Sequence, residues 1–180
     1  TAQVGKWHLG EDPTTQGIDI NIAGNTRGSL SSYFSPYKNP DLKDGPKGEY
    51  LTDRLTDEAI QILKKFKEDP FFLYFPFYTI HTPLQGRPDL KEKYASRGKQ
   101  LSDYAAMVEC LDENIGRLLT ALDELGLTEN TIVLFSSDNG GIRKLSKQDP
   151  WRAGKGSYFE GGIRVPLSVR WPGVVKPGST

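Results

Sequence analysis

The residues best suited to chemistry in this sequence are two histidines, two lysines that follow a glycine, and an Asp-Asn pair. They are Lys6, His8, His81, Asp138, Asn139 and Lys155. Lysine presents a point charge to an anion, imidazole moves protons near neutral pH, and carboxylate and amide oxygens suit hard cations such as Ca²⁺ or Mg²⁺. Together the set would suit cleavage of an oxyanion ester held against a divalent cation.

Each of these signals also has an ordinary structural explanation. Asp-Asn-Gly-Gly at 138–141 is a common turn sequence, because Asn-Gly favours turns and Asp tolerates the same backbone conformations. A histidine is about as often a hydrogen-bonded structural residue as a functional one, and Lys155 could be a solvated surface lysine. The segment around Lys155 lacks the Gly-x-x-x-x-Gly-Lys-Ser/Thr spacing of a phosphate-binding loop. The elements that position these residues therefore matter more than any single motif.

Apolar periodicity predicts two amphipathic helices, over residues 52–67 and 102–125. The first is expected to begin at a Thr52 or Asp53 cap and the second at a Ser102 or Asp103 cap, with Gly126 ending the second in a left-handed conformation. The apolar residues recur at helical spacings of three and four. They are Leu55, Ala59, Ile62 and Phe66 in the first, and Tyr104, Val108, Leu111, Ile115, Leu118, Leu122 and Leu125 in the second.

Short strands are expected at 2–4, 71–80, 131–135 and 163–171, and the strand at 131–135 is expected to be buried. The run 71–80 is continuously apolar, which is typical of a strand covered on both faces, although Pro76 favours an edge or a bulge. With the helix 102–125, strands 71–80 and 131–135 would form a right-handed βαβ unit in a mainly parallel sheet. Ligands of such sheets bind at the carboxyl ends of strands, where both histidines and the Asp-Asn pair follow. Residues 11–50 are expected to be a long irregular segment, and such segments are often functional.

Composition excludes several classes of protein. The chain has 23 Lys and Arg against 23 Asp and Glu, so it lacks the basic footprint of a nucleic-acid binder. No apolar run is long enough to span a membrane, and the first ten residues do not form a signal peptide. The single cysteine excludes an internal disulfide. The length suits one domain or part of one.

Several strings, in order along nearly the whole chain, resemble the sulfatase family. Gly5-Lys6-Trp7-His8-Leu9-Gly10 resembles the second signature of that family. Residues 70–74, leading to His81-Thr82-Pro83, resemble its strand and active-site histidine. Residues 111–116 and 130–141 are similar to its metal-binding region, and 155–156, 160–166 and 171–173 complete the pattern.

The resemblance implies an alkaline-phosphatase-like α/β fold and hydrolysis of sulfate esters. It implies a formylglycine nucleophile, installed by a formylglycine-generating enzyme, and a divalent cation, Ca²⁺ or Mg²⁺. Carried over by motif, Asp138 and Asn139 would bind the metal, and Lys6 and Lys155 would hold sulfate oxygens. His8 would assist the formylglycine, and His81 would contact the sulfate and protonate the leaving oxygen. Family members that act on glycans are often exported to the periplasm, the cell exterior or the lysosome.

The sequence lacks two motifs that are found in the family. No Cys-x-Pro or Ser-x-Pro occurs in the 180 residues, so the nucleophile motif is missing, as is the Asp-Asp pair that supplies further metal ligands. Cys110 lies within the predicted second helix and is interpreted as a small, buried or half-buried apolar residue. We therefore interpret residues 1–180 as a partial sulfatase catalytic domain, an internal fragment of a longer enzyme, and expect the fragment alone to be inactive.

Two alternatives to a sulfatase stay open. One is a phosphatase or phosphodiesterase of the same superfamily, although such enzymes use zinc ions with several His ligands. The other is a non-catalytic module that binds a sulfated glycan. For the substrate we favour a carbohydrate sulfate over a small aryl sulfate. Side chains of the long segment could contact a sugar, namely Arg27, Tyr33, Phe34, Tyr37, Lys38, Lys43 and Lys47.

Overall fold

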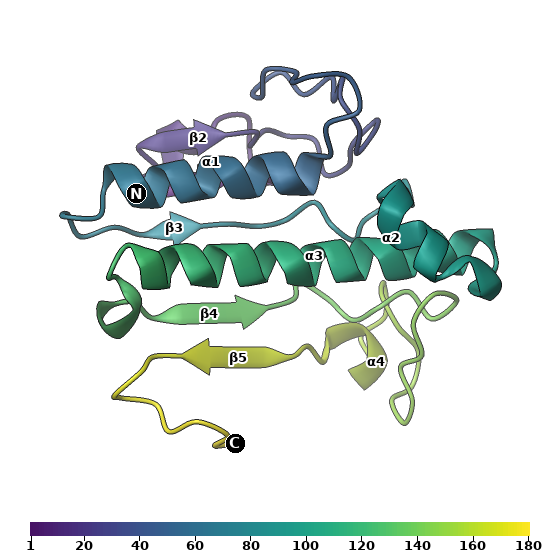
Figure 1. The fold of residues 1–180 in the computed structure, drawn as a ribbon. Helices are drawn as coiled ribbons and strands as arrows, with labels where there is room; N and C mark the ends of the chain where they lie inside the picture. The colour runs from purple at the N-terminus through teal and green to yellow at the C-terminus, as the bar shows by residue number, and fades with distance from the viewer. The chain divides into compact units, whose positions relative to one another are not determined.

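The computed structural model describes all residues from Thr1 to Thr180, which form two compact units, 1–125 and 126–180. Unit 1 contains β1 (Ala2–Val4), η1 (Pro13–Gln16), β2 (Ile20–Ile22), α1 (Leu51–Lys65), β3 (Leu73–Tyr74), α2 (Pro88–Lys93), η2 (Ala95–Arg97) and α3 (Lys99–Glu124). Unit 2 contains η3 (Thr128–Asn130), β4 (Val133–Ser136), α4 (Glu160–Ile163) and β5 (Leu167–Arg170) (Figure 1). None of the helices combines the length and the apolar character needed to cross a membrane.

Unit 1 is built on a three-stranded parallel sheet in the order β2-β1-β3. Because the strands are parallel, their carboxyl ends meet at one edge. The strand expected at 2–4 is confirmed, whereas β2 lies inside the segment expected to be irregular. Within the run 71–80, only Leu73 and Tyr74 pair with β1 as a strand. The expectation of a ten-residue strand buried on both faces is therefore wrong, and Phe72 and Tyr74 are exposed.

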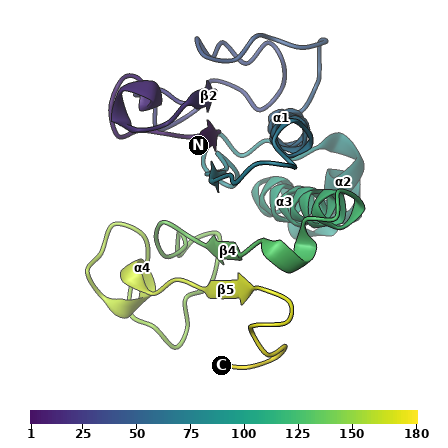
Figure 2. The same cartoon turned by 90° about the vertical axis from the view of Figure 1, so that its left-hand side faces the viewer.

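Helices α1 and α3 lie side by side, and α1 also packs on β1 (Figure 2). The expected apolar face of α1 is confirmed, since Leu55, Ala59 and Ile62 are buried. The expected capping residues are wrong for both helices. Tyr50 and Gly98 occupy the two N-cap positions, and neither makes a side-chain cap hydrogen bond. Gly126 does follow α3 with a positive φ of 71°, as the sequence predicts.

The residues expected to cap the helices instead join them to neighbouring elements. Thr52 Oγ1 lies 2.6 Å from Thr79 Oγ1, which precedes His81 by two residues. The Asp53 carboxylate accepts a hydrogen bond of 2.7 Å from Asn114 Nδ2 of α3. Asp103 accepts one of 3.1 Å from the N–H of Gly86. These side chains point away from the helix ends because buried polar groups elsewhere need hydrogen-bond partners.

The buried face of α3 differs from the expected leucine stripe. Ala106, Met107, Cys110 and Asn114 are fully buried, whereas Val108 of the stripe is exposed. The prediction that Cys110 is a buried small residue is confirmed, and burial raises the pKa of its thiol to about 12. A periodic leucine pattern thus did not identify the face that packs on α1, where small side chains allow the helices to approach closely.

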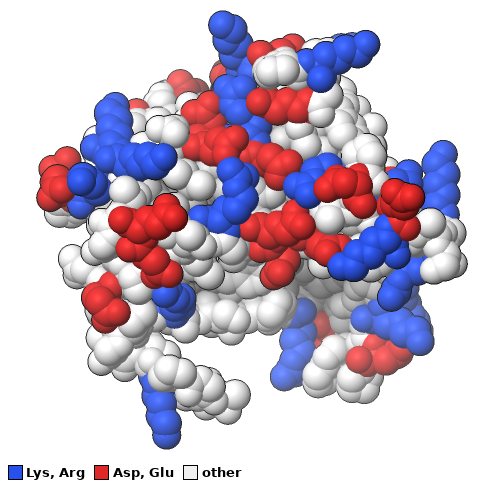
Figure 3. Space-filling view, in the orientation of Figure 1, with Lys and Arg blue, Asp and Glu red and all other residues white.

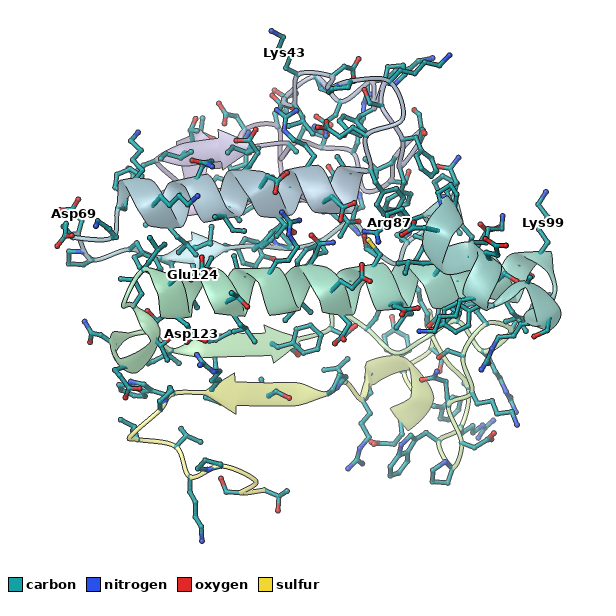
Figure 4. The ribbon with its side chains drawn as sticks, viewed as in Figure 1. Lys43, Asp69, Arg87, Lys99, Asp123 and Glu124 are labelled. Carbon is teal, nitrogen blue, oxygen red and sulfur yellow. The ribbon has the colours of Figure 1, made fainter.

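A cluster of charged side chains links α1 and α3 along one side of this helix pair. Arg87, labelled in Figure 4, lies between α1 and α3. It forms ion pairs with Asp53 at 3.3 Å, Asp89 at 2.8 Å and Glu113 at 3.0 Å. Over the helices of unit 1, acidic and basic side chains alternate in Figure 3 without forming a patch of one sign, in keeping with the balanced composition.

Unit 2 is organised around an antiparallel pair, β4 with β5, in which Leu134 faces Val169 in register. The expected βαβ unit is therefore wrong in its pairing, because β3 and β4 belong to different sheets. The expectation that 131–135 is buried is also wrong, since Leu134 is 68% exposed. The broader fold class, mixed α/β with a parallel sheet and helices, is confirmed by unit 1.

Candidate functional site

The six candidate residues divide into two sets, one in each unit. Lys6, His8 and His81 follow β1 and β3 at the carboxyl edge of the parallel sheet. The loops after these two strands are joined by a hydrogen bond of 2.8 Å from the Lys6 N–H to the Pro76 carbonyl. These three residues therefore lie on adjoining loops, at the edge where parallel sheets bind their ligands.

Lys6 is held through the buried side chain of Gln3. The Gln3 carboxamide donates from Nε2 to the carbonyl oxygen of Gly5 at 2.8 Å and to that of Lys6 at 3.3 Å. Gln3 is fully buried, and its Oε1 has no hydrogen-bond partner. The Lys6 ammonium forms no ion pair, so its charge is available to an anion.

His8 is exposed, but its backbone is held in an unusual conformation. Its φ is 61°, in the left-handed region that non-glycine residues rarely adopt. The His8 N–H donates to the Asn25 carbonyl at 2.9 Å. The imidazole lies against the backbone of Gly28, where a Cβ atom would overlap the ring. The surrounding loop thus fixes both the backbone and the ring of His8.

His81 is half-buried, and one of its ring nitrogens is already engaged. Nδ1 lies 3.0 Å from the Thr82 carbonyl oxygen, an acceptor, so Nδ1 carries a proton in this contact. Nε2 is then the nitrogen left for a substrate. The His81 N–H donates to the Tyr78 carbonyl at 2.9 Å, which closes the turn that presents the ring.

In unit 2, the loop 138–141 and Lys155 lie together. The Lys155 N–H donates to the Gly141 carbonyl at 3.0 Å, and the Gly140 N–H donates to the Gly162 carbonyl at 2.9 Å. Asn139 Nδ2 donates to the Gly140 carbonyl at 3.0 Å, which leaves Asn139 Oδ1 as an unused acceptor. The Asp138 carboxylate and the Lys155 ammonium are exposed and form no ion pair with each other or with another residue.

Close backbone packing at glycines creates this arrangement. A Cβ at Gly140 would overlap the carbonyl oxygen of Gly161, and a Cβ at Gly162 would overlap those of Ser157 and Gly154. Because the obstacles are backbone atoms, they cannot rotate out of the way as a side chain would. Glycine is therefore required for the loop of Asp138 to meet the turn of Lys155.

The Asp-Asn pair fits part of a site for a hard cation. Both side chains offer oxygen atoms, the donors that Ca²⁺ and Mg²⁺ prefer. Two such residues are fewer than the six to eight oxygens that Ca²⁺ typically takes, and no group of three or more His, Cys, Asp or Glu residues is arranged to hold a metal. These residues can supply a share of the ligands and not the whole set.

Two residues expected to contact a sugar are wrong for that role. Tyr33 and Tyr37 are each only 1% exposed, and the Tyr37 hydroxyl donates to Glu49 at 2.8 Å. Burial raises the pKa of both hydroxyls. Arg27 and Lys38 of the same segment are exposed. The tyrosines hold the segment together: their rings are buried, and their hydroxyls donate to backbone carbonyls in the case of Tyr33 and to the Glu49 carboxylate in the case of Tyr37.

Sequence reasoning missed the residues that support the candidate site. Gln3, Asn25 and Gly28 touch the loops that carry Lys6 and His8, yet none belongs to a recognisable motif. The one available signal was Gln3, a polar residue in the middle of an apolar strand, where an unpaired amide is costly.

Comparison with known proteins now places the chain in a family. A model of the sulfatase family matches residues 1–180. A sulfatase of Formosa agariphila is 42% identical over 170 residues, which cover 83% of this chain and 30% of the relative. An N-acetylgalactosamine-6-O-sulfatase of Bacteroides thetaiotaomicron is 35% identical over 144 residues, covering 73% of this chain and 27% of the relative.

The fold comparison agrees. The crystal structure of Ps i-CgsB in complex with k-i-k-neocarrahexaose superposes with a TM-score of 0.79 and 32% identity, covering 96% of this chain and 45% of that one. The chain belongs to the sulfatase family, and it spans less than a third of the length of the two curated relatives above.

Proposed function

We propose that the protein containing residues 1–180 hydrolyses the sulfate ester of a carbohydrate. The observation that carries this proposal is that Lys6 and Lys155, each in a loop fixed by its own neighbours, have no acidic partner. An ammonium group without a counter-charge, carried by a loop whose backbone is fixed, is suited to bind a sulfuryl oxygen and to offset the charge that develops there during cleavage.

The remaining residues take complementary roles in the proposal. His81 acts as the doubly protonated imidazolium: it gives the proton on Nε2 to the leaving oxygen and keeps the proton on Nδ1 that contacts the Thr82 carbonyl. The donor is needed because the leaving alkoxide is too basic to depart unprotonated. His8 assists the nucleophile. Asp138 and Asn139 would hold part of the shell of a Ca²⁺ or Mg²⁺ ion, which supplies positive charge against the sulfuryl oxygens when bound. No residue of this chain is assigned as the nucleophile, since the motif for formylglycine does not occur in it.

The choice of a carbohydrate substrate has support from the relatives. The names of the Bacteroides thetaiotaomicron enzyme and of the neocarrahexaose complex both refer to sugars. The formylglycine-generating enzyme as a partner, and export of the mature protein, belong to the same proposal.

A substrate screen tests this proposal. The natural gene product that contains residues 1–180 would be assayed with nitrophenyl sulfate, nitrophenyl phosphate and sulfated carrageenan oligosaccharides, with CaCl₂ and with EDTA. We expect release of sulfate that EDTA abolishes and that exceeds release of phosphate. Faster phosphate release would favour the phosphatase alternative, and glycan binding without turnover would favour the non-catalytic one.

The role of His81 has a sharper test in the same assay. His81→Gln should lower kcat on the sugar sulfate by roughly 100-fold or more, as expected for loss of a general acid. The loss on nitrophenyl sulfate should be much smaller, because nitrophenolate departs without a proton. Equal losses on both substrates would contradict the proton-donor role.

A further inference from the structure

One segment of the irregular region, residues 23–37, contacts the loops of both histidines. We call it the clamp segment. At its start, the Asn25 carbonyl accepts the His8 N–H at 2.9 Å, and the Gly28 backbone lies against the His8 imidazole. Asn25 is itself tied down, since its Nδ2 donates to Asn39 at 3.0 Å and to Asp41 at 2.9 Å. The left-handed backbone of His8 is thus held by a fixed partner rather than by its own preference.

At the other end of the clamp segment, Tyr33 holds the turn of His81. Its hydroxyl lies 2.7 Å from the Tyr78 carbonyl and 2.9 Å from that of His81, so one O–H is shared between the two carbonyls of the turn. The Tyr33 N–H donates to Gln85 Oε1 at 2.8 Å, beyond the histidine. Burial raises the pKa of the hydroxyl, which therefore keeps the proton that it donates.

The direction of the His81 ring depends on this turn. Because Nδ1 contacts the carbonyl of the next residue, Thr82, the ring orientation follows the local backbone. A shift of the His81 carbonyl would therefore move Nε2. The stacked ring of Tyr50, with its centroid 5.8 Å from that of Tyr33, and a 2.7 Å hydrogen bond from the Tyr50 hydroxyl to the Gln85 carbonyl keep Tyr33 in place.

We propose that Gly28 and Tyr33 are positioning residues that set the two imidazoles independently, Gly28 for His8 and Tyr33 for His81. Neither touches the substrate in this scheme. The inference rests on the proposed catalytic roles of the histidines for its effect on rate, and on geometry alone for its effect on ring orientation. In this proposal, residues 23–37 are more than a connecting loop, because they support the imidazoles of both His8 and His81.

Two variants of the natural gene product test the proposal, Tyr33→Phe and Gly28→Ala. The imidazole nitrogen chemical shifts are measured by NMR, with His8→Gln and His81→Gln used for assignment. Tyr33→Phe should change the shifts of His81 and leave those of His8, and Gly28→Ala should do the reverse. On a sugar sulfate, each should lower kcat by roughly 10- to 100-fold with little change in KM, as small misplacements of reacting groups do.

Tyr37→Phe is the matched control. It removes an equally buried hydroxyl of the same segment whose partner is Glu49 and not a histidine loop, so both imidazoles should keep their shifts and kcat should hold. If Tyr33→Phe does not fold, Gln85→Leu removes the acceptor of the Tyr33 N–H and should move the His81 signals alone. Unchanged His81 shifts in Tyr33→Phe, or equal changes in Tyr37→Phe, would overturn the proposal. If the wild type hydrolyses no sulfate ester, the proposed function fails while the shifts still decide the positioning claim.

Discussion

The two sets of candidate residues are held in place by different means. In unit 1, the buried side chain of Gln3 fixes the loop of Lys6, and that of Tyr33 fixes the turn of His81. In unit 2, backbone packs directly on backbone at Gly140 and Gly162, and the loop of Asp138 meets the turn of Lys155 through a hydrogen bond between backbone groups.

The difference predicts how each region tolerates change. Where side chains hold a loop, removing one hydrogen-bonding group leaves a buried carbonyl unpaired, which costs about 1 to 3 kcal/mol. Where close packing at glycines holds a loop, adding one methyl group forces the backbone apart. The loss of stability is larger when the methyl group meets rigid backbone atoms than when it meets a flexible side chain. The loops of Lys6 and His81 in unit 1 should therefore be sensitive to the loss of a side chain, and the loop of Asp138 in unit 2 to the addition of one.

Alkaline pH should produce the largest contrast. Burial raises the pKa of Tyr33, Tyr37 and Tyr50, and that of Tyr78 to about 12. All four lie in unit 1, whereas the tyrosine of unit 2, Tyr158, is 97% exposed. A raised pKa in the folded state gives stability that is complete below the ordinary tyrosine value and is lost as pH rises through the raised values. Unit 1 should unfold between about pH 10 and 12.

Phenolate absorbance and circular dichroism followed together would check this expectation. Four tyrosines should ionise in step with the loss of helix signal. Gradual ionisation of all tyrosines near the ordinary value, with the helices intact, would show that the four hydroxyls are not buried as described.

Gly162→Ala should have the next largest effect. The added methyl would overlap the carbonyl oxygens of Ser157 and Gly154, so we expect a loss of about 3 kcal/mol in the free energy of unfolding of unit 2, at the upper end of the usual cost of overpacking. Urea denaturation monitored by tryptophan fluorescence would measure it, because Trp151 and Trp171 belong to unit 2. A loss below about 1 kcal/mol would contradict the close packing.

Gln3→Leu should cost less, about 2 kcal/mol, because it leaves the carbonyls of Gly5 and Lys6 without their donor while keeping the buried volume. The denaturation midpoint of unit 1 would report the change. Gln61→Leu, at an exposed position of α1, is the control and should leave the midpoint nearly unchanged. Equal midpoints for the two variants would mean that Gln3 does not hold the turn.

The smallest expected effect has the opposite sign. Gly116 lies in α3 with open space around its position, so Gly116→Ala should stabilise the protein by about 0.5 to 1 kcal/mol through helix propensity. Thermal unfolding would detect it. Because the added methyl is the same as in Gly162→Ala, a loss of stability here would break the contrast between crowded and open glycines.

The sequence predicts the features of the fold that depend on neighbouring residues. It does not predict those that depend on contacts between residues far apart in the chain. The period of Leu55, Ala59 and Ile62 predicts α1, and the motifs predict which residues follow the strands. The antiparallel partner of β4 and the buried face of α3 depend on packing that periodicity does not encode. Likewise, the capping rule predicts Asp53 as an N-cap of α1. In the structure, the Asp53 carboxylate instead accepts a hydrogen bond from the buried amide of Asn114 in α3.

The central claim is that Lys6 and Lys155 both serve the proposed hydrolysis of a sulfate ester. The most direct measurement is kcat/KM of the natural gene product on a sugar sulfate for Lys6→Ala, Lys155→Ala and the double variant, with Lys64→Ala as an exposed control. Each single variant should lose roughly 100-fold or more, and the double variant should lose much less than the product of the two, as groups that act together do. Full activity in either single variant, or losses that simply multiply, would contradict the claim.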